Sequence, residues 1–265
     1  MNYADKRFTK WMGSANQEVE WYGFDSLELY QHNLQNNYDK LKNNDWIDKS
    51  FTYKFNSHGF RCEEFTDTDS IMFLGCSYTL GVGLPLENIF ATIVAQNLNL
   101  TCFNLGVGGS SADTGFRLTK IYLQKLKPKI VVSTFLWPHR MELLTTTLAY
   151  IHFTPNNLAI LNEKNLRKFA PLQMLNDANL RKYYEEFYAK WIEESSNADL
   201  NYLKNTLAIA KLCDDLGIKY IDYKSIPDTD AAAVDLDHPC KARDLIHPGI
   251  KINQNMAMSI LNAIQ

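Results

Sequence analysis

The fold is decided by the stretch Ile71-Met72-Phe73-Leu74-Gly75-Cys76-Ser77-Tyr78-Thr79-Leu80-Gly81. Its first five residues form a short apolar run that ends in glycine, as expected of a buried strand. Apolar residues then recur at helical spacing over 89–98. The segment therefore predicts a strand, a loop and a helix, with Ser77 in the loop directly after the strand.

The same unit recurs along the chain. Strands are predicted at 101–105, 130–136 and 218–222, and helices at 112–126, 198–216 and 250–264. Pro128 ends the helix that precedes the strand at 130–136. This repeated β-α order predicts an α/β fold with three layers, α/β/α and flavodoxin-like, around a central parallel sheet. Sheets of this kind bind ligands at the carboxyl ends of their strands.

Two segments depart from this alternation. Residues 1–68 are rich in aromatic side chains, which need an apolar surface to pack on, so we expect an ordered extension packed on a core domain at 69–265. Residues 141–196 are interpreted as a mainly helical insertion that could cover a site. Its aromatic run at 183–191 is interpreted as packing and not as a sugar-binding platform.

Composition excludes several classes of function. The chain has 265 residues, 46% of them hydrophobic, which is enough for one sizeable core. A net charge of −3 gives no reason to expect nucleic acid as a partner. The N-terminus is charged throughout and no stretch approaches eighteen consecutive apolar residues, so we expect no signal peptide, no membrane insertion and a cytoplasmic location. No oligomeric state is predicted.

The cysteines indicate neither disulfides nor a metal. The five of them are widely spaced and form no CxxC pair, so we expect reduced, structural thiols. Asp237-His238-Pro239-Cys240 carries possible ligands but has no partner cluster elsewhere in the sequence. We therefore expect no metal site and no cofactor.

Ser77 is the first candidate for chemistry, because it follows a buried strand and its own N–H can help to bind an oxyanion. A serine nucleophile needs a base that a third group orients. Near the C-terminus, a loop ahead of the last helix contains Asp244 and His247, three residues apart. The order Ser, Asp, His along the chain is one that supports this chemistry.

Three blocks of the sequence resemble the SGNH/GDSL-like serine hydrolases. Gly-x-Ser-x-Thr at 75–79 and Asp-x-x-His-Pro at 244–248 are similar to the first and last blocks of that family. The run at 104–111 is similar to the second block, whose oxyanion-binding glycine falls on Gly109 by position. The resemblance implies hydrolysis of a small-molecule or carbohydrate ester through an acyl-enzyme on Ser77, without a cofactor.

The chain departs from the pattern of this family at two places. Cys76 stands where the family has an aspartate before the nucleophile. The third block normally supplies an asparagine to the oxyanion hole, whereas this chain reads Trp137-Pro138-His139-Arg140. Loss of one oxyanion donor costs roughly 100- to 1000-fold in rate. We therefore expect either that His139 or Arg140 replaces the asparagine, or that the enzyme is slower or differently specialised.

Each of these residues also has a simpler interpretation. Ser77 could cap a helix, and His247 with Asp244 could anchor the start of the last helix. His139 and Arg140 could be a solvated strand end, and His58 and His152 packing or surface residues. The glycines at 106–109 could form a dinucleotide-binding turn, although Ser111 replaces its third glycine. At the level of function, the alternatives are an O-acyltransferase and a non-catalytic ligand-binding module.

Overall fold

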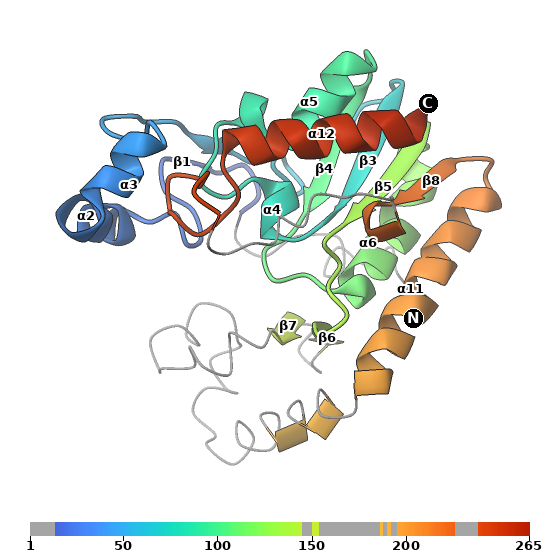
Figure 1. Ribbon diagram of the computed structural model, residues 1–265. Helices are drawn as coiled ribbons and strands as arrows, with labels where there is room; N and C mark the ends of the chain where they lie inside the picture. Colours follow the sequence, from blue (N-terminus) through green and yellow to red (C-terminus); the bar gives the residue numbers. More distant parts are fainter. Residues whose placement is uncertain (1–13, 145–149, 154–185, 188–189, 192–194, 226–237) are drawn as a thin grey trace.

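A parallel four-stranded sheet forms the centre of the protein (Figure 1). The computed structural model describes residues 14–144, 150–153, 186–187, 190–191, 195–225 and 238–265. The strands are β3 (Ser70–Gly75), β4 (Thr101–Gly106), β5 (Ile130–Thr134) and β8 (Lys219–Asp222). They lie in the order β4-β3-β5-β8, and every neighbouring pair is parallel. The predicted α/β architecture with a central parallel sheet is confirmed.

The strand order has a reversal that marks where ligands bind. The chain moves from β3 outward to β4 and then returns to place β5 on the other side of β3. The loops that follow β3 and β5 therefore leave the same edge of the sheet and turn in opposite directions. A doubly wound sheet opens a crevice at such a reversal, at the carboxyl ends of the strands. Ser77 lies in the first of these two loops.

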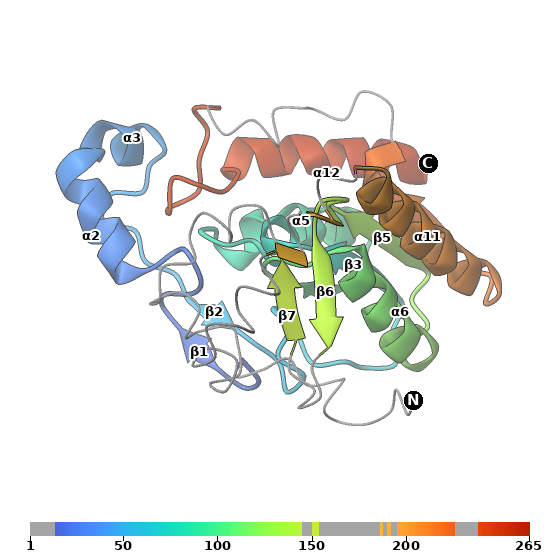
Figure 2. The same cartoon turned by 90° about the horizontal axis from the view of Figure 1, so that it is seen from below.

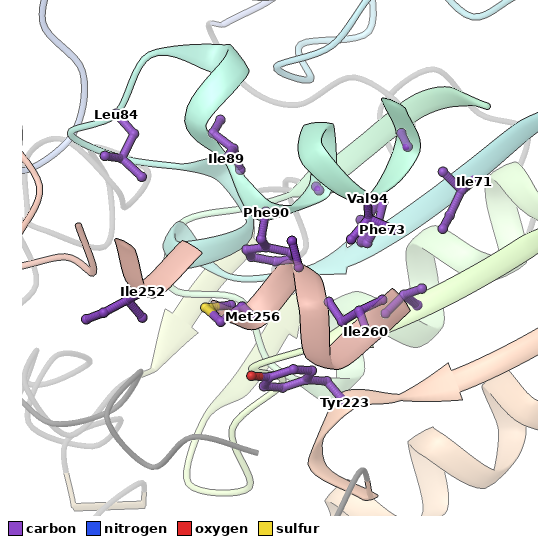
Figure 3. Packing of buried hydrophobic residues seen from close by; sticks show 14 of the residues in the cluster. Ile71, Phe73, Leu84, Ile89, Phe90, Val94, Tyr223, Ile252, Met256 and Ile260 are labelled. Carbon is purple, nitrogen blue, oxygen red and sulfur yellow. The ribbon is translucent and has the colours of Figure 1, made fainter. Parts of the chain in front are cut away.

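Alternation along β3 produces the three layers. Ile71 and Phe73 face a cluster that includes Phe90, Met256 and Ile260 (Figure 3). The residues between them, Met72 and Leu74, belong to the cluster on the opposite face. Because successive side chains of a strand point to opposite faces, one apolar run can fill both cores. All six residues of β3 are buried, as the unbroken apolar run predicts.

The helices cover the sheet on both faces (Figures 1 and 2). One face carries α5 (Phe90–Asn97) and α12 (Ile250–Ile264), and the other carries α6 (Ala112–Leu126) and α11 (Ser195–Asp214). These bounds lie close to the predicted ones. Ser111 and Thr114 form a capping box at the start of α6, and Lys127 ends that helix in a left-handed conformation. Short helices within the sheet domain include α4 (Ser77–Leu80), η1 (Leu86–Asn88) and η2 (Tyr223–Ser225).

The N-terminal segment contains two helices that periodicity does not reveal. These are α2 (Leu27–Asn36) and α3 (Tyr38–Asn43), and the segment also pairs β1 (Glu18–Val19) with β2 (Tyr53–Lys54). Asn33 is the buried residue of α2, so that helix shows no apolar stripe. Leu41 and Trp46 are buried in the cluster that contains α12. The segment thus contributes side chains to the core of the sheet domain.

The segment at 141–196, interpreted from sequence as mainly helical, begins with strands. β6 (Met141–Leu144) and β7 (Tyr150–Phe153) pair antiparallel. Arg117 of α6 forms a salt bridge with Glu142 at 2.6 Å, which fixes β6 against that helix. A contact between residues this far apart in sequence produces no periodic pattern, so the strand β6 could not be predicted from sequence. Most of 154–194 lies outside the described residues, and so does most of the aromatic run at 183–191.

Two general features complete the description of the fold. All five cysteines are free thiols. Within the described ranges, none of the helices combines the length and the apolar character that crossing a bilayer requires.

Gly75, at the end of β3, should be intolerant of any side chain. A Cβ atom there would lie 2.0 Å from Thr79 Oγ1 and 2.4 Å from the Thr134 carbonyl oxygen. We expect Gly75→Ala to lower the free energy of unfolding by about 1–3 kcal/mol, because the backbone of β5 has to move. The control is Gly108→Ala, since a Cβ atom at Gly108 would meet nothing within 4 Å. Urea denaturation checks this, and equal stabilities of the two variants would contradict it.

Candidate active site

Ser77 is the first residue of α4, two positions after the end of β3. The residue in the capping position is Cys76, and its side chain makes no capping hydrogen bond. Ser77 is partly exposed, and in the described part of the chain its hydroxyl forms no hydrogen bond. A helix-capping role therefore does not account for the hydroxyl of Ser77.

Hydrogen bonds from the neighbouring loop hold the turn that carries Ser77. The carbonyl oxygen of Gly75 accepts from Val107 N at 2.8 Å and from Ser110 Oγ at 2.7 Å. Asn104 Nδ2 donates to the Thr79 carbonyl oxygen at 2.6 Å. The chain on both sides of the serine is thus attached to β4 and to the loop after it.

Gly109 lies within that attached loop. Its φ of 75° falls in the left-handed region, where glycine is unstrained. Val107 and Ser110, on either side of it, both bond to the carbonyl oxygen of Gly75. The loop that contains Gly109 is therefore fixed beside the turn that carries Ser77, as a shared oxyanion site requires.

Asp244 and His247 lie in one loop, joined by a short hydrogen bond. His247 Nδ1 and Asp244 Oδ2 are 2.5 Å apart. The other carboxylate oxygen accepts from the backbone N–H groups of Ile246 and His247, both at 3.0 Å. Leu245 adopts a left-handed φ of 58° between them. One tight turn therefore aims both side chains, and it also anchors the chain just before α12, as the simpler interpretation expected.

The electrostatics of this pair keep Asp244 ionised. Burial favours the neutral acid, but the charge of His247 and the hydrogen bonds from its ring and backbone outweigh this effect and lower the pKa of Asp244. An ionised carboxylate only accepts hydrogen bonds, so Nδ1 of His247 carries the proton. In the neutral form of the ring the lone pair is then on Nε2, which is the nitrogen that a general base uses.

Two contacts bring this pair to the nucleophile turn. The rings of His247 and Tyr78 pack edge to face, with centroids 5.5 Å apart, and Tyr78 directly follows Ser77. Arg243 N donates to the Gly83 carbonyl oxygen at 3.0 Å, three residues beyond α4. Among the described residues, no hydrogen bond joins Ser77 Oγ to His247. Such bonds are often long in enzymes without substrate and shorten when it binds.

A buried ion pair supports the Asp244 loop from the N-terminal segment. Arg243 Nη2 lies 2.7 Å from Asp25 Oδ2, and both side chains are almost completely buried. The guanidinium is also enclosed by the rings of Trp21 and Phe51, at 3.9 and 4.0 Å from their centroids. The residue just before Asp244 is therefore clamped by groups far away in sequence.

The same network continues to the loop after α4. Tyr53 Oη donates to Asp25 Oδ2 at 2.5 Å and accepts from Gly83 N at 2.7 Å. Arg61 lies over the Tyr53 ring at 4.1 Å and donates to the Gly81 carbonyl oxygen at 2.6 Å. The N-terminal segment thus holds the loop that carries Asp244 and His247 and also the loop that directly follows the Ser77 helix α4.

The third loop of the site follows β5. Phe135 has a left-handed φ of 53°, a strained conformation for a side chain of this size. Its ring packs between Tyr78, at 5.1 Å, and Trp137, at 5.8 Å. His139 stacks on Trp137, and both His139 and Arg140 are partly buried, so neither is a fully solvated strand end. Burial and the charges of Arg140 and Lys224 lower the pKa of His139.

The structure describes only some of the other histidines considered from sequence and of the possible metal ligands at 237–240. His58 packs against Phe65 and Tyr122, whereas the side chain of His152 lies outside the described residues. Nδ1 of His238 accepts from Cys240 N, and Asp237 lies outside the description. Within the described ranges, no group of three or more His, Cys, Asp or Glu side chains is arranged to hold a metal ion.

Comparison with known proteins returned matches at the level of structure. No family model and no curated protein matches the chain. TesA is 12% identical, with a TM-score of 0.38, over 74% of this chain and 98% of TesA. The psychrotrophic esterase EstA from Pseudoalteromonas sp. is 14% identical, with a TM-score of 0.35, over 74% of this chain and 96% of EstA. The acetyl xylan esterase AlAXEase is 16% identical, with a TM-score of 0.33, over 74% of this chain and all of that protein.

The same comparison includes proteins described as members of the G-D-S-L family and as SGNH hydrolases, the family that the sequence blocks resemble. At these identities and TM-scores the likeness describes overall structure alone.

The Arg243–Asp25 pair should be strongly coupled. Arg243→Met leaves the Asp25 carboxyl buried without its cation, so we expect a loss of about 3–5 kcal/mol in the free energy of unfolding. The double variant Asp25→Leu/Arg243→Met should lose clearly less than the sum of the single variants. Lys129→Ala, which removes an exposed pair with Asp69, is the control and should change stability by less than about 1 kcal/mol. Additive losses in urea denaturation would show that the pair is not coupled.

The lowered pKa of Asp244 predicts a pH dependence of stability. Its ordinary value is 3.8, and the folded value lies below it. Ionised Asp244 therefore stabilises the fold above about pH 4, and this contribution is lost as the pH falls through the folded pKa. We expect the stability of the wild type to fall more steeply below about pH 4 than that of Asp244→Asn. Parallel pH profiles in urea denaturation would show that the Asp244 pKa is not lowered.

Proposed function

We propose that this chain is a serine-dependent hydrolase of carboxylic esters, with Ser77 as nucleophile, His247 as general base and Asp244 as the group that orients it. The observation that carries the proposal is the 2.5 Å Asp244–His247 hydrogen bond in a loop that packs on Tyr78. A buried carboxylate that orients an imidazole beside a serine with an unbonded hydroxyl is the arrangement that activates such a nucleophile.

In the reaction, Ser77 Oγ attacks the carbonyl carbon of the ester while His247 Nε2 takes the hydroxyl proton. The tetrahedral intermediate collapses, and His247 returns the proton to the departing alcohol oxygen, leaving an acyl-enzyme. His247 then takes a proton from water, whose oxygen attacks the acyl carbon. As the second tetrahedral intermediate collapses, His247 gives this proton to Ser77 Oγ, which restores the free hydroxyl and releases the acid. These steps require no metal or organic cofactor.

The oxyanion that forms in each half of the reaction would bind the N–H groups of Ser77 and Gly109. The attachment of the 107–110 loop to Gly75 supports this assignment, because it holds Gly109 beside the nucleophile turn. The missing asparagine leaves room for a third donor from the loop after β5, which carries His139 and Arg140. A neutral imidazole keeps one N–H, so the lowered pKa of His139 does not remove its capacity to donate.

Small acyl groups, acetyl on a carbohydrate among them, are the substrate class that the sequence resemblance implies and the first to test. If Ser77 instead passes its acyl group to an alcohol, the protein is an acyltransferase, and added alcohol acceptors will yield ester in preference to free acid. A non-catalytic binding module would show no turnover at all.

Ser77→Ala is expected to lose at least about 1000-fold in kcat for p-nitrophenyl acetate and to escape labelling by a fluorophosphonate. Ser259→Ala removes a serine hydroxyl in the middle of α12 and should retain both activities. Circular dichroism and urea denaturation confirm that both variants are folded. Equal turnover by Ser77→Ala, or no labelling of the wild type, would refute the nucleophile assignment.

A further inference from the structure

The loop after β5 holds polar groups that the proposed reaction does not use. Trp137 Nε1, Arg140 Nε and Arg140 Nη1 are buried, and among the described residues none of the three has a hydrogen-bond partner. Both side chains come from one turn, in which Arg140 N donates to the Trp137 carbonyl oxygen at 3.1 Å. The guanidinium carbon lies 5.8 Å from the centroid of the Trp137 ring. Arg140 as a whole stays partly exposed.

The charge of Arg140 is also not neutralised. In the part of the chain that the structure describes, no carboxylate forms an ion pair with it. Glu142, two residues further on, is engaged by Arg117 at 2.6 Å and by Thr114 at 2.9 Å. Leaving charged donors buried and unpaired costs free energy, and a bound ligand with matching acceptors would remove that cost.

The position of this turn makes it part of the substrate site. Gly75 of β3 is paired in register with Thr134 of β5, so Ser77 and Trp137 follow their paired strand ends by two and three residues. The Phe135 ring contacts both Tyr78 and Trp137. Burial raises the pKa of Tyr78 to about 12, and the nearby charge of Arg140 opposes that rise. Arg140 therefore lies at the β3/β5 reversal, close to the candidate nucleophile.

We propose that Arg140, together with the indole N–H of Trp137, binds a carboxylate of the substrate, so that this site takes negatively charged esters. The inference rests on the proposed function of Ser77. A guanidinium forms strong charge-assisted hydrogen bonds with a carboxylate, and a permanent anion neutralises a permanent cation. In this arrangement the transient oxyanion binds the backbone N–H groups of Ser77 and Gly109, with His139 as the third donor.

Matched esters test the proposal. In one pair, p-nitrophenyl hydrogen succinate carries a carboxylate in the acyl part, and p-nitrophenyl pentanoate is its neutral counterpart. In the other, para-acetoxybenzoate carries the carboxylate in the alcohol part, and its methyl ester is neutral. For at least one pair we expect the wild type to prefer the charged ester by about 10- to 100-fold in kcat/KM. No preference in either pair would overturn the proposal.

Variants of Arg140 test whether this residue causes the preference for the charged ester. Arg140→Gln should abolish this preference, mainly through a higher KM for the charged ester, so that kcat/KM for the charged ester falls to that of its neutral counterpart. Arg140→Lys should retain part of the preference for the charged ester, because lysine supplies the positive charge but not the planar guanidinium that forms two parallel hydrogen bonds. Lys224→Met, which removes another cation that acts on His139, is the control and should keep the preference. If Arg140→Gln lowers kcat equally for both esters, Arg140 is an oxyanion donor and the proposal fails.

A binding measurement separates this proposal from the proposed function. With Ser77→Ala protein, calorimetry should detect monomethyl succinate binding at least about tenfold tighter than dimethyl succinate, and the difference should vanish when Arg140→Gln is added. Such binding in a protein whose wild type hydrolyses no ester would refute the hydrolase alone. Ser77-dependent hydrolysis with equal binding of the two succinates would refute the carboxylate site alone.

Discussion

The buried ion pair between Arg243 and Asp25 joins the N-terminal segment to the loop that carries the candidate general base. Asp25 lies in the N-terminal segment, whereas Arg243 directly precedes Asp244 in the loop ahead of α12. The carboxylate also accepts from Tyr53, whose hydroxyl receives the N–H of Gly83. One buried carboxyl therefore fixes the loop of Asp244 and His247 against the loop that follows the Ser77 turn. The N-terminal segment is in this sense part of the site.

Around this support, the site uses the geometry of the parallel sheet. Three loops leave the carboxyl ends of neighbouring strands β4, β3 and β5, and each contributes different functional groups to the site. The first carries Gly109, the second carries Ser77, and the third carries the donors of Trp137 and Arg140 that have no partner within the described part of the chain. The pair of Asp244 and His247 is brought to these loops from the end of the chain. Left-handed backbone at Phe135 and Leu245, in two of the converging loops, is typical of functional sites.

Much of this arrangement could be predicted from sequence. Apolar runs locate β3 and β5, because all of their residues are buried and have to be compatible with an apolar core. The edge strand β8, with Lys219 exposed, is located by the β-α alternation instead. The sequence blocks identify Ser77, Gly109, Asp244 and His247 as candidates. The partner of Arg243 could not be predicted, since Asp25 lies 218 residues away and an aspartate in a polar segment gives no local signal. Trp137 was missed because an indole N–H becomes informative only when its surroundings show that it has no partner.

The most direct test of the account is a crystal structure of the protein after reaction with a fluorophosphonate, which leaves a tetrahedral phosphonyl group in place of the transition state. The account predicts phosphorus bonded to Ser77 Oγ and a phosphonyl oxygen within hydrogen-bond distance of the N–H groups of Ser77 and Gly109. Nε2 of His247 should face the oxygen of Ser77, with Asp244 still bonded to Nδ1. A phosphonyl group on another residue, or one on Ser77 with His247 turned away, would contradict it.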